Sequence, residues 1–129
     1  MRRILTALAL ATLIAAPAAA GPKLNPEQRL AKVIEGRLAG DPVSCINLRR
    51  IQSSQIIDRT AIVYEAGNTL YVNRPRAGAE SLDSWDVLVV RPFNSQLCSI
   101  DAVDLYDRGS RMQNGFVLLG DFVPYRKVR

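Results

Sequence analysis

The spacing of apolar residues indicates a helix near the start of the polar part of the chain. Asn25 suits the N-cap position and Pro26 the first helical position. Between residues 25 and 38 apolar side chains recur at helical spacing, at Leu30, Val33, Ile34 and Leu38. Gly36 weakens the middle of this segment, and Gly40-Asp41-Pro42 ends it. We therefore expect one short amphipathic helix at about residues 25–38.

From Val43 onward the pattern changes to short extended runs. Gly67-Asn68 separates two of them and is typical of a two-residue hairpin turn. Ser53-Ser54 interrupts the pattern, and Pro124 ends the last run. The predicted strands cover residues 44–51, 55–58, 61–66, 69–73, 85–91, 99–106 and 115–123.

These runs predict an α+β fold. It would have one N-terminal helix and an antiparallel sheet of about six or seven short strands, arranged as a small barrel or an open sandwich. Residues 85–91 include four successive aliphatic side chains, which predict a strand buried on both faces. We expect residues 99–106 and 115–123 to pair.

The first twenty residues have the pattern of a cleavable signal peptide. Arg2 and Arg3 precede an apolar run of about thirteen residues, which is shorter than a membrane-spanning helix requires. Ala18-Ala19-Ala20 is an A-x-A cleavage site. We predict cleavage after Ala20, a single domain at residues 21–129 without a transmembrane anchor, and a periplasmic or secreted location.

The charge distribution argues against nucleic-acid binding. Removal of Arg2 and Arg3 lowers the formal net charge from +5 by two units, and the basic tail at residues 126–129 accounts for the remainder. A nucleic-acid-binding protein would normally concentrate basic residues on one face of its folded body. No nucleic-acid partner is therefore expected.

Cys45 and Cys98 are the only cysteines. In an oxidising compartment two cysteines usually pair, so we predict a Cys45–Cys98 disulfide. Two buried free thiols are the alternative.

The chain contains no histidine, which removes the commonest general base and the commonest metal ligand. No cofactor or metal site is expected. The remaining candidates for catalysis are carboxylates, with Asp83 and Asp86 flanking Trp85, and with Asp58 and Glu65 in neighbouring runs. Asp83 equally suits a role in the turn before Trp85, and Trp85 suits a place in the core or at its rim.

Two further charged patterns have ordinary structural explanations. Asp101, Asp104 and Asp107 recur every third residue, which does not match a calcium loop and favours turn and edge positions. Three arginine pairs are candidates for an anion-binding surface, although a solvated, ion-paired surface explains them better: Arg49/Arg50, Arg74/Arg76 and Arg108/Arg111.

Several short motifs resemble those of a family of small exported bacterial proteins of unknown function. They are Cys45-Ile46, Ile51, Ile57-Asp58, Tyr71-Val72-Asn73, Leu97-Cys98, Asp101 and Leu119-Gly120-Asp121-Phe122. The resemblance implies an exported, compact β-rich domain and carries no activity. Members often have two further cysteines, at places that correspond here to residues near Ala79 and Val117. Their joint absence would leave Cys45 to pair with Cys98.

The sequence as a whole favours a non-enzymatic exported domain that binds a partner or serves the cell envelope, with an envelope protein as a candidate partner. A hydrolase-like enzyme that uses carboxylates and a protein inhibitor remain as alternatives. Two facing carboxylates with raised pKa values in a pocket would favour the enzyme. An unpaired strand edge or an exposed apolar patch would favour a protein partner.

Overall fold

A computed structural model describes residues 11–17 and 21–129. Within these residues it contains one α-helix, two short 3₁₀ helices and ten strands. The elements are α1 (Pro26–Val33), β1 (Arg37–Ala39), β2 (Cys45–Asn47), η1 (Leu48–Arg50), β3 (Ser53–Ile57), β4 (Ala61–Ala66), β5 (Thr69–Asn73), η2 (Ala79–Ser81), β6 (Asp86–Val89), β7 (Gln96–Cys98), β8 (Ala102–Asp107), β9 (Gln113–Leu118) and β10 (Phe122–Lys127).

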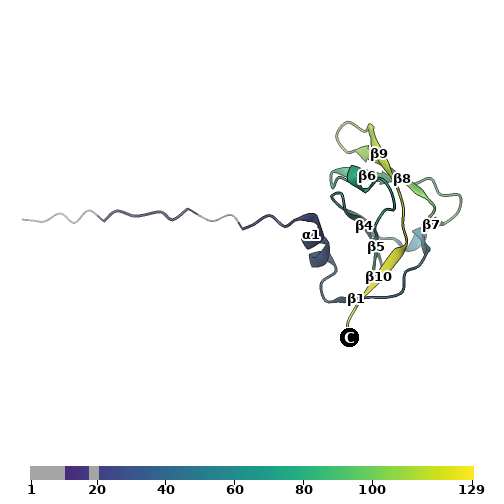
Figure 1. Cartoon of the computed structure of the whole chain (residues 1–129), viewed down its shortest axis with the longest axis horizontal. Coiled ribbons are helices and arrows are strands. Elements are labelled where there is room, and N and C mark those ends of the chain that lie inside the picture. The colour runs from purple at the N-terminus through teal and green to yellow at the C-terminus, as the bar shows by residue number, and fades with distance from the viewer. Residues whose placement is uncertain (1–10, 18–20) are drawn as a thin grey trace, which may run out of the picture.

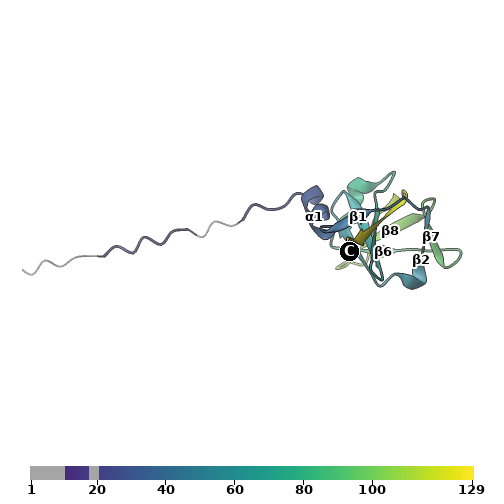
Figure 2. The ribbon, with the colours of Figure 1, turned by 90° about the horizontal axis from the view of Figure 1, so that it is seen from below.

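The predicted α+β fold with antiparallel strands is confirmed. The strands form a five-stranded sheet in the order β1-β10-β5-β4-β3, a three-stranded sheet in the order β6-β8-β9, and the pair β2-β7. None of these sheets closes into a barrel within the described residues. Helix α1 lies at one flank of the strands, and residues 21–25 extend away from them (Figure 1, Figure 2).

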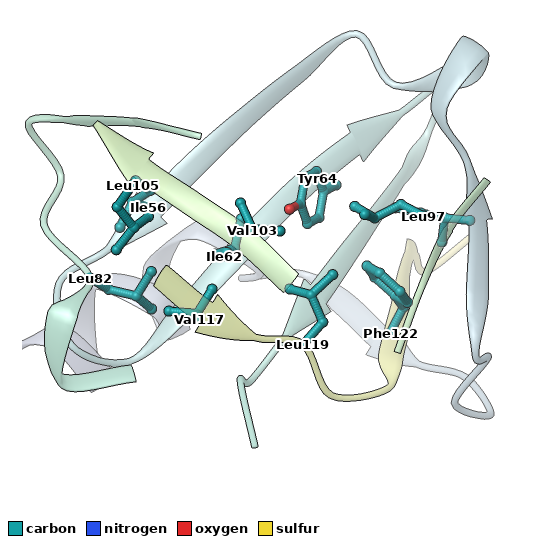
Figure 3. Close-up of a cluster of buried hydrophobic side chains, with 11 residues drawn as sticks. Ile56, Ile62, Tyr64, Leu82, Leu97, Val103, Leu105, Val117, Leu119 and Phe122 are labelled. Atoms are coloured by element: carbon teal, nitrogen blue, oxygen red, sulfur yellow. The ribbon is translucent and has the colours of Figure 1, made fainter. Parts of the chain in front are cut away.

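Strand β4 is buried on both faces over four successive residues, Ala61–Tyr64. Ile62 and Tyr64 point into the interior between the sheets, where the Tyr64 ring lies 5.9 Å from that of Phe122 (Figure 3). Ala61 and Val63 point to the opposite face, in a second core that Leu30 of α1 covers. Four successive residues are therefore buried because one layer of the fold lies on each side of β4.

The predicted burial of residues 85–91 on both faces is wrong. Strand β6 covers only Asp86–Val89, and Val87 is 42% exposed while Leu88 packs against the core. The reason is the position of the strand. β6 is at the edge of the three-stranded sheet, and among the described residues no layer covers the outer face of that sheet at Val87.

The helix is shorter than predicted. It ends at Val33, and Gly36 adopts a left-handed conformation with φ at +75°. This conformation lets the chain reverse into β1, which occupies part of the predicted helical range. Asn25 caps the N-terminus as expected, since its side chain accepts a hydrogen bond from the backbone N–H of Gln28.

The C-terminal segment also differs from the prediction. The predicted strand at residues 115–123 is two strands, β9 and β10, separated at Leu119–Asp121. Pro124 does not end β10, although proline has no N–H to donate. β1 stops at Ala39, so no strand of the described chain lies beside Pro124 on that side. The only backbone hydrogen bond that the described residues make there is accepted by the Pro124 carbonyl from the N–H of Gly40. The expected pairing of the 99–106 and 115–123 regions is confirmed as β8 against β9.

The other local predictions have mixed outcomes. The hairpin at Gly67-Asn68 is confirmed, since it joins β4 to β5 with Ala66 opposite Thr69. Ser53 and Ser54 do not interrupt a strand; they belong to β3. The predicted signal peptide falls mostly on residues 1–10 and 18–20, which lie outside the described residues. Within the described part of the chain, no helix has the length and apolar character that crossing a membrane requires.

The predicted Cys45–Cys98 disulfide is confirmed. The two cysteines are directly opposite each other in the β2-β7 pair. Backbone hydrogen bonds join Ser99 to Ser44 and Leu48 to Ser95, so alternation makes Cys45 and Cys98 a non-hydrogen-bonded pair. Such pairs bring Cα atoms closest together, and here they are 4.0 Å apart, below the usual range for a disulfide.

Candidate functional site

A groove separates the β3 edge of the five-stranded sheet from the β6 edge of the three-stranded sheet. We call this groove the seam. Its volume is about 430 Å³, within the range of small-molecule and peptide sites. Successive residues of both strands line it, together with two arginines: Ser54, Gln55, Ile56, Ile57, Ser84, Asp86, Val87, Leu88, Arg29 and Arg108.

One end of the seam is closed by Asp58. Its Oδ1 accepts a hydrogen bond from the backbone N–H of Ser84 at 2.6 Å, and its Oδ2 accepts one from Arg29 at 2.8 Å. Next to it the N–H of Arg59 donates to the carbonyl of Leu82. β3 runs toward this closed end and β6 runs away from it. The two edges are therefore antiparallel and separate from this point.

Partial burial opposes ionisation of Asp58, but the hydrogen bonds from Ser84 and Arg29 outweigh it and lower the pKa of the carboxyl below its usual value. Asp58 is thus a structural carboxylate with both oxygens occupied.

Register determines which backbone groups of β3 face the seam. Ala66 and Thr69 close a two-residue hairpin and bond to each other, and backbone hydrogen bonds alternate from side to side along a strand. The backbone N–H and C=O groups of Val63 and Glu65 therefore point from β4 toward β3. Those of their partners Gln55 and Ser53 point from β3 toward β4. The backbone N–H and C=O of Ser54 and Ile56 point the other way, into the seam, where no strand of the described chain pairs with them.

The same argument applies to β6. The N–H of Leu119 donates to the carbonyl of Asp101, and that of Asp107 donates to the carbonyl of Met112, so the backbone groups of the odd-numbered residues of β8 point toward β9. The backbone groups of the even-numbered residues of β8 point toward β6, where Val87 and Val89 are their partners. Leu88 therefore directs its N–H and C=O into the seam. Within residues 21–129, no strand pairs with this side of β6 either.

Asp86 is the buried carboxylate of the seam, with 4% of its surface exposed. Burial raises its pKa, and the nearby Asp83 and Asp107 raise it further. Asn114, an extra residue where the register of β8 and β9 shifts, opposes this increase by donating to both carboxylate oxygens at 3.3 and 3.4 Å. These are long hydrogen bonds, so Asp86 is only partly compensated.

Arg108 lines the seam and contacts Trp85, which is not one of the lining residues. Trp85 is 58% exposed, which fits the predicted rim position, and Val87 adds a second exposed apolar side chain. The Arg108 guanidinium lies 5.7 Å from the centre of the Trp85 ring, and its Nε donates to the Trp85 carbonyl. Both cationic groups that line the seam, those of Arg29 and Arg108, are therefore already in use.

Of the four carboxylates considered for catalysis, only Asp86 is available in the seam. Asp83 has the predicted turn role, because its Oδ1 accepts from the N–H of Trp85. Asp58 is engaged as described, and Glu65 lies on β4 with its carboxylate bonded to Ser53. The pKa of Asp86 is raised, whereas that of Asp58 is lowered, so these two carboxylates do not form the expected pair with raised values.

The arginine pairs do not share one arrangement. Arg74 forms a two-bonded ion pair with Glu27, and Arg76 donates to the carbonyl of Leu119. Arg108 contacts Trp85. Of the six arginines only Arg74 forms an ion pair in the described chain, and no side-chain hydrogen bond of Arg49 or Arg50 occurs there.

The three regularly spaced aspartates have separate roles. Asp101 accepts from the N–H of Cys98, and Asp107 accepts from Gly109 and Ser110, so both shape turns as expected. The edge position expected for Asp104 is wrong, since β8 is the middle strand of its sheet. No group of three or more potential metal-ligating side chains occurs in residues 11–17 and 21–129.

The motifs behind the family resemblance prove to be structural contacts. Cys45 is bonded to Cys98, and Asn73 is hydrogen-bonded to Gly120. Asp58 and Asp101 fix turns, as described above. The disulfide joins the two strands of the β2-β7 pair, and Asn73 holds the connection between β9 and β10. None of these contacts lines the seam, apart from that of Asp58 at its closed end.

Comparison with known proteins adds no relative, because no protein-family model, no curated protein and no solved structure matches the chain.

Proposed function

We propose that this protein is a non-enzymatic binding domain of the cell envelope, which holds a segment of another protein in the seam. A single observation carries the proposal. Two strand edges that no described strand covers face each other across one groove. Natural proteins normally cover or disrupt such edges, because they pair readily with another chain.

We propose a periplasmic or secreted location for this activity. The disulfide supports an oxidising compartment outside the cytoplasm. The apolar N-terminal run and the small residues before Gly21 support export by a cleaved signal peptide. N-terminal sequencing of the protein recovered from the envelope should begin at Gly21, and an intact Met1 terminus would contradict cleavage.

The alternative of a carboxylate-based hydrolase rests on Asp86, whose raised pKa suits a general acid. A hydrolase of that kind needs a second carboxylate across the cleft. Asp58 is the candidate that follows β3 on the opposite side, and both of its oxygens are occupied. We therefore prefer binding to catalysis.

Site-specific photocrosslinking in cells tests the proposal. A photoreactive residue at Ser54 or Val87 lies in the seam, whereas one at Lys127 lies on β10, three strands from β3 in the same sheet. We expect one adduct of the same mass from both seam positions and none from Lys127. Adducts of equal yield from all three positions, or none from the seam, would contradict the proposal.

An activity test separates the enzyme from the binding domain. Purified protein would be assayed for hydrolysis of peptide, ester and glycoside substrates. Activity that Asp86→Asn abolishes would favour the hydrolase and overturn the proposal.

A further inference from the structure

The seam has the form of a missing strand. The five-stranded sheet ends at β3 and the three-stranded sheet begins at β6. The contacts at the closed end join the end of β3 to the residues before β6, so the two chains run in opposite directions from that end. We propose that an extended segment of a separate protein lies in the seam as an additional strand on β3, with a lysine or arginine side chain against Asp86. This inference rests on the proposed function and specifies its ligand.

The sequence of β3 is suited to strand addition. It reads Ser-Ser-Gln-Ile-Ile and carries no charge and no proline, the residues that usually protect an edge. The opposite edge of the same sheet is different. β1 has only three residues, begins at Arg37 and is followed by Gly40-Asp41-Pro42. The protein therefore protects one edge of the sheet by sequence and leaves the other suited to pairing.

Main-chain groups give the segment its position. Ser54 and Ile56 present two N–H and two C=O groups to the seam, which is the pattern an incoming antiparallel or parallel strand requires. Leu88 presents the same groups from the opposite wall. A segment on β3 thus has polar backbone groups on both sides.

The negative charge of Asp86 determines which side chain of the bound segment fits at the closed end of the seam. Asp86 lies at the start of β6, close to Asp83 and Asp107, whose charges repel its own. Arg29 is paired with Asp58, and Arg108 is bound to Trp85, so neither of the cations that line the seam is paired with Asp86. A cationic side chain of the ligand supplies the opposite charge that this buried carboxylate lacks.

The occupant is a bare segment and not the edge of a second copy. Since β3 and β6 line opposite sides of one groove, the β3 edge of another folded copy would have to enter between them in order to pair. An extended segment has no such obstacle. The half-exposed Val87 side chain, which lines the seam, adds an apolar contact for it.

A peptide library tests the inference. The disulfide-bonded protein, purified from the periplasm, is used to select from random ten-residue peptides displayed on phage. We expect the selected peptides to share a lysine or arginine at one position. On binding, the amide signals of Ser54, Ile56 and Leu88 should shift and become protected from hydrogen exchange, and the fluorescence of Trp85, the sole tryptophan, should change.

Two matched pairs of variants identify the contacts. Ser54→Pro removes the N–H that faces the seam, whereas Ser54→Ala keeps it; we expect only the proline variant to lose binding. Asp86→Asn should weaken a selected peptide by roughly 30-fold, and should not weaken its lysine-to-norleucine analogue. Melting curves of each variant verify that it is folded.

The outcomes distinguish the two proposals. If no peptide is selected, or the peptides shift signals away from the seam, the proposed function fails and this inference fails with it. If peptides bind in the seam but Ser54→Pro binds as well as Ser54→Ala, strand addition is wrong. Equal effects of Asp86→Asn on the lysine peptide and its analogue would refute the basic side chain. A dimer that Ser54→Pro dissociates would replace the separate partner with a second copy.

Discussion

Asn73 holds Gly120 by two hydrogen bonds, although the residues are 47 positions apart in the sequence. The Nδ2 group of Asn73 donates to the Gly120 carbonyl at 2.7 Å, and its Oδ1 accepts from the Gly120 N–H at 2.9 Å. A Cβ atom at position 120 would lie 2.4 Å from the carbonyl oxygen of Arg74, so the contact also requires glycine. It fixes the connection between β9 and β10, and with it the position of one sheet relative to the other.

Asn73→Ala should therefore destabilise the protein strongly. The substitution leaves the N–H and C=O of Gly120 without these partners, at a cost of about 2–4 kcal/mol in the free energy of unfolding. The melting temperature should fall by roughly 10 °C or more. Asn68→Ala, in the exposed hairpin turn, is the control and should change stability little. A cost below about 0.5 kcal/mol for Asn73→Ala would show that the contact does not hold the sheets together.

Local features of the fold were predictable from the sequence, and its layers were not. The Gly67-Asn68 hairpin depends on neighbouring residues alone, and the Cys45–Cys98 pair was predicted from an expected oxidising compartment and the presence of only two cysteines. The identity of the doubly buried strand depends on what packs on each face. The aliphatic run in β6 therefore led to the prediction that this strand is buried on both faces, whereas the structure buries β4 in that way.

The candidate site was predictable only in part. Asp86 and Trp85 were recognised as candidates from their residue types. Asp86 lines the seam, and Trp85 contacts the lining residue Arg108. The seam itself arises because β3 and β6 do not pair, and no local pattern encodes the absence of a partner. Similarly, the contact of Asp58 with Arg29 joins residues 29 positions apart, which sequence spacing did not indicate.

Loss of the disulfide should lower stability substantially. The bond joins residues separated by 53 positions, and the loop-entropy model then gives about 4 kcal/mol. We expect reduction, or the double substitution Cys45→Ala with Cys98→Ala, to lower the melting temperature by roughly 10 °C or more. Calorimetry with and without reductant measures the effect, and the double variant should be insensitive to reductant. Ready alkylation of both cysteines in native protein would contradict the bond.

Hydrogen exchange should alternate along β3 in the free protein. Gln55 and Ile57 direct their N–H groups to β4, so these amides should be protected. Ser54 and Ile56 direct theirs into the seam, so these amides should exchange much faster although the Ile56 side chain is buried. Residue-resolved exchange by NMR measures the pattern. Uniform protection of Ser53–Ile57 would mean that the edge is already covered, and the seam would then not be a docking site.

Asp58→Asn should destabilise the protein at neutral pH and not at low pH. The pKa of Asp58 is lowered in the folded state, so its contribution to stability is present above the usual value of 3.8 and is lost as pH falls through the folded pKa. At pH 7 we expect a cost of about 1–3 kcal/mol from the weakened hydrogen bonds to Ser84 and Arg29. Denaturant unfolding at several pH values measures it, with Asp121→Asn at an exposed position as control. A cost that persists unchanged at pH 2 would rule out the charge as its cause.

Asp86→Asn should have the opposite pH dependence. Because the pKa of Asp86 is raised in the folded state, ionisation of this carboxyl opposes folding, and stability falls as pH rises from 3.8 through the folded pKa. The asparagine variant avoids this loss, so its advantage over the wild type should be largest at pH 7 and should vanish near pH 3. Unfolding curves of both proteins across that range measure the difference, and an advantage that does not depend on pH would contradict the raised pKa.

The same variant separates stability from function. If Asp86 served only the fold, replacing it with a more stable residue would carry no loss. In our proposal its carboxylate binds the cationic side chain of a ligand, so Asp86→Asn should be both more stable at pH 7 and weaker in binding. In our proposal the reason for a buried carboxylate with a raised pKa in this groove is the ligand, and measuring both properties on one variant tests that reason.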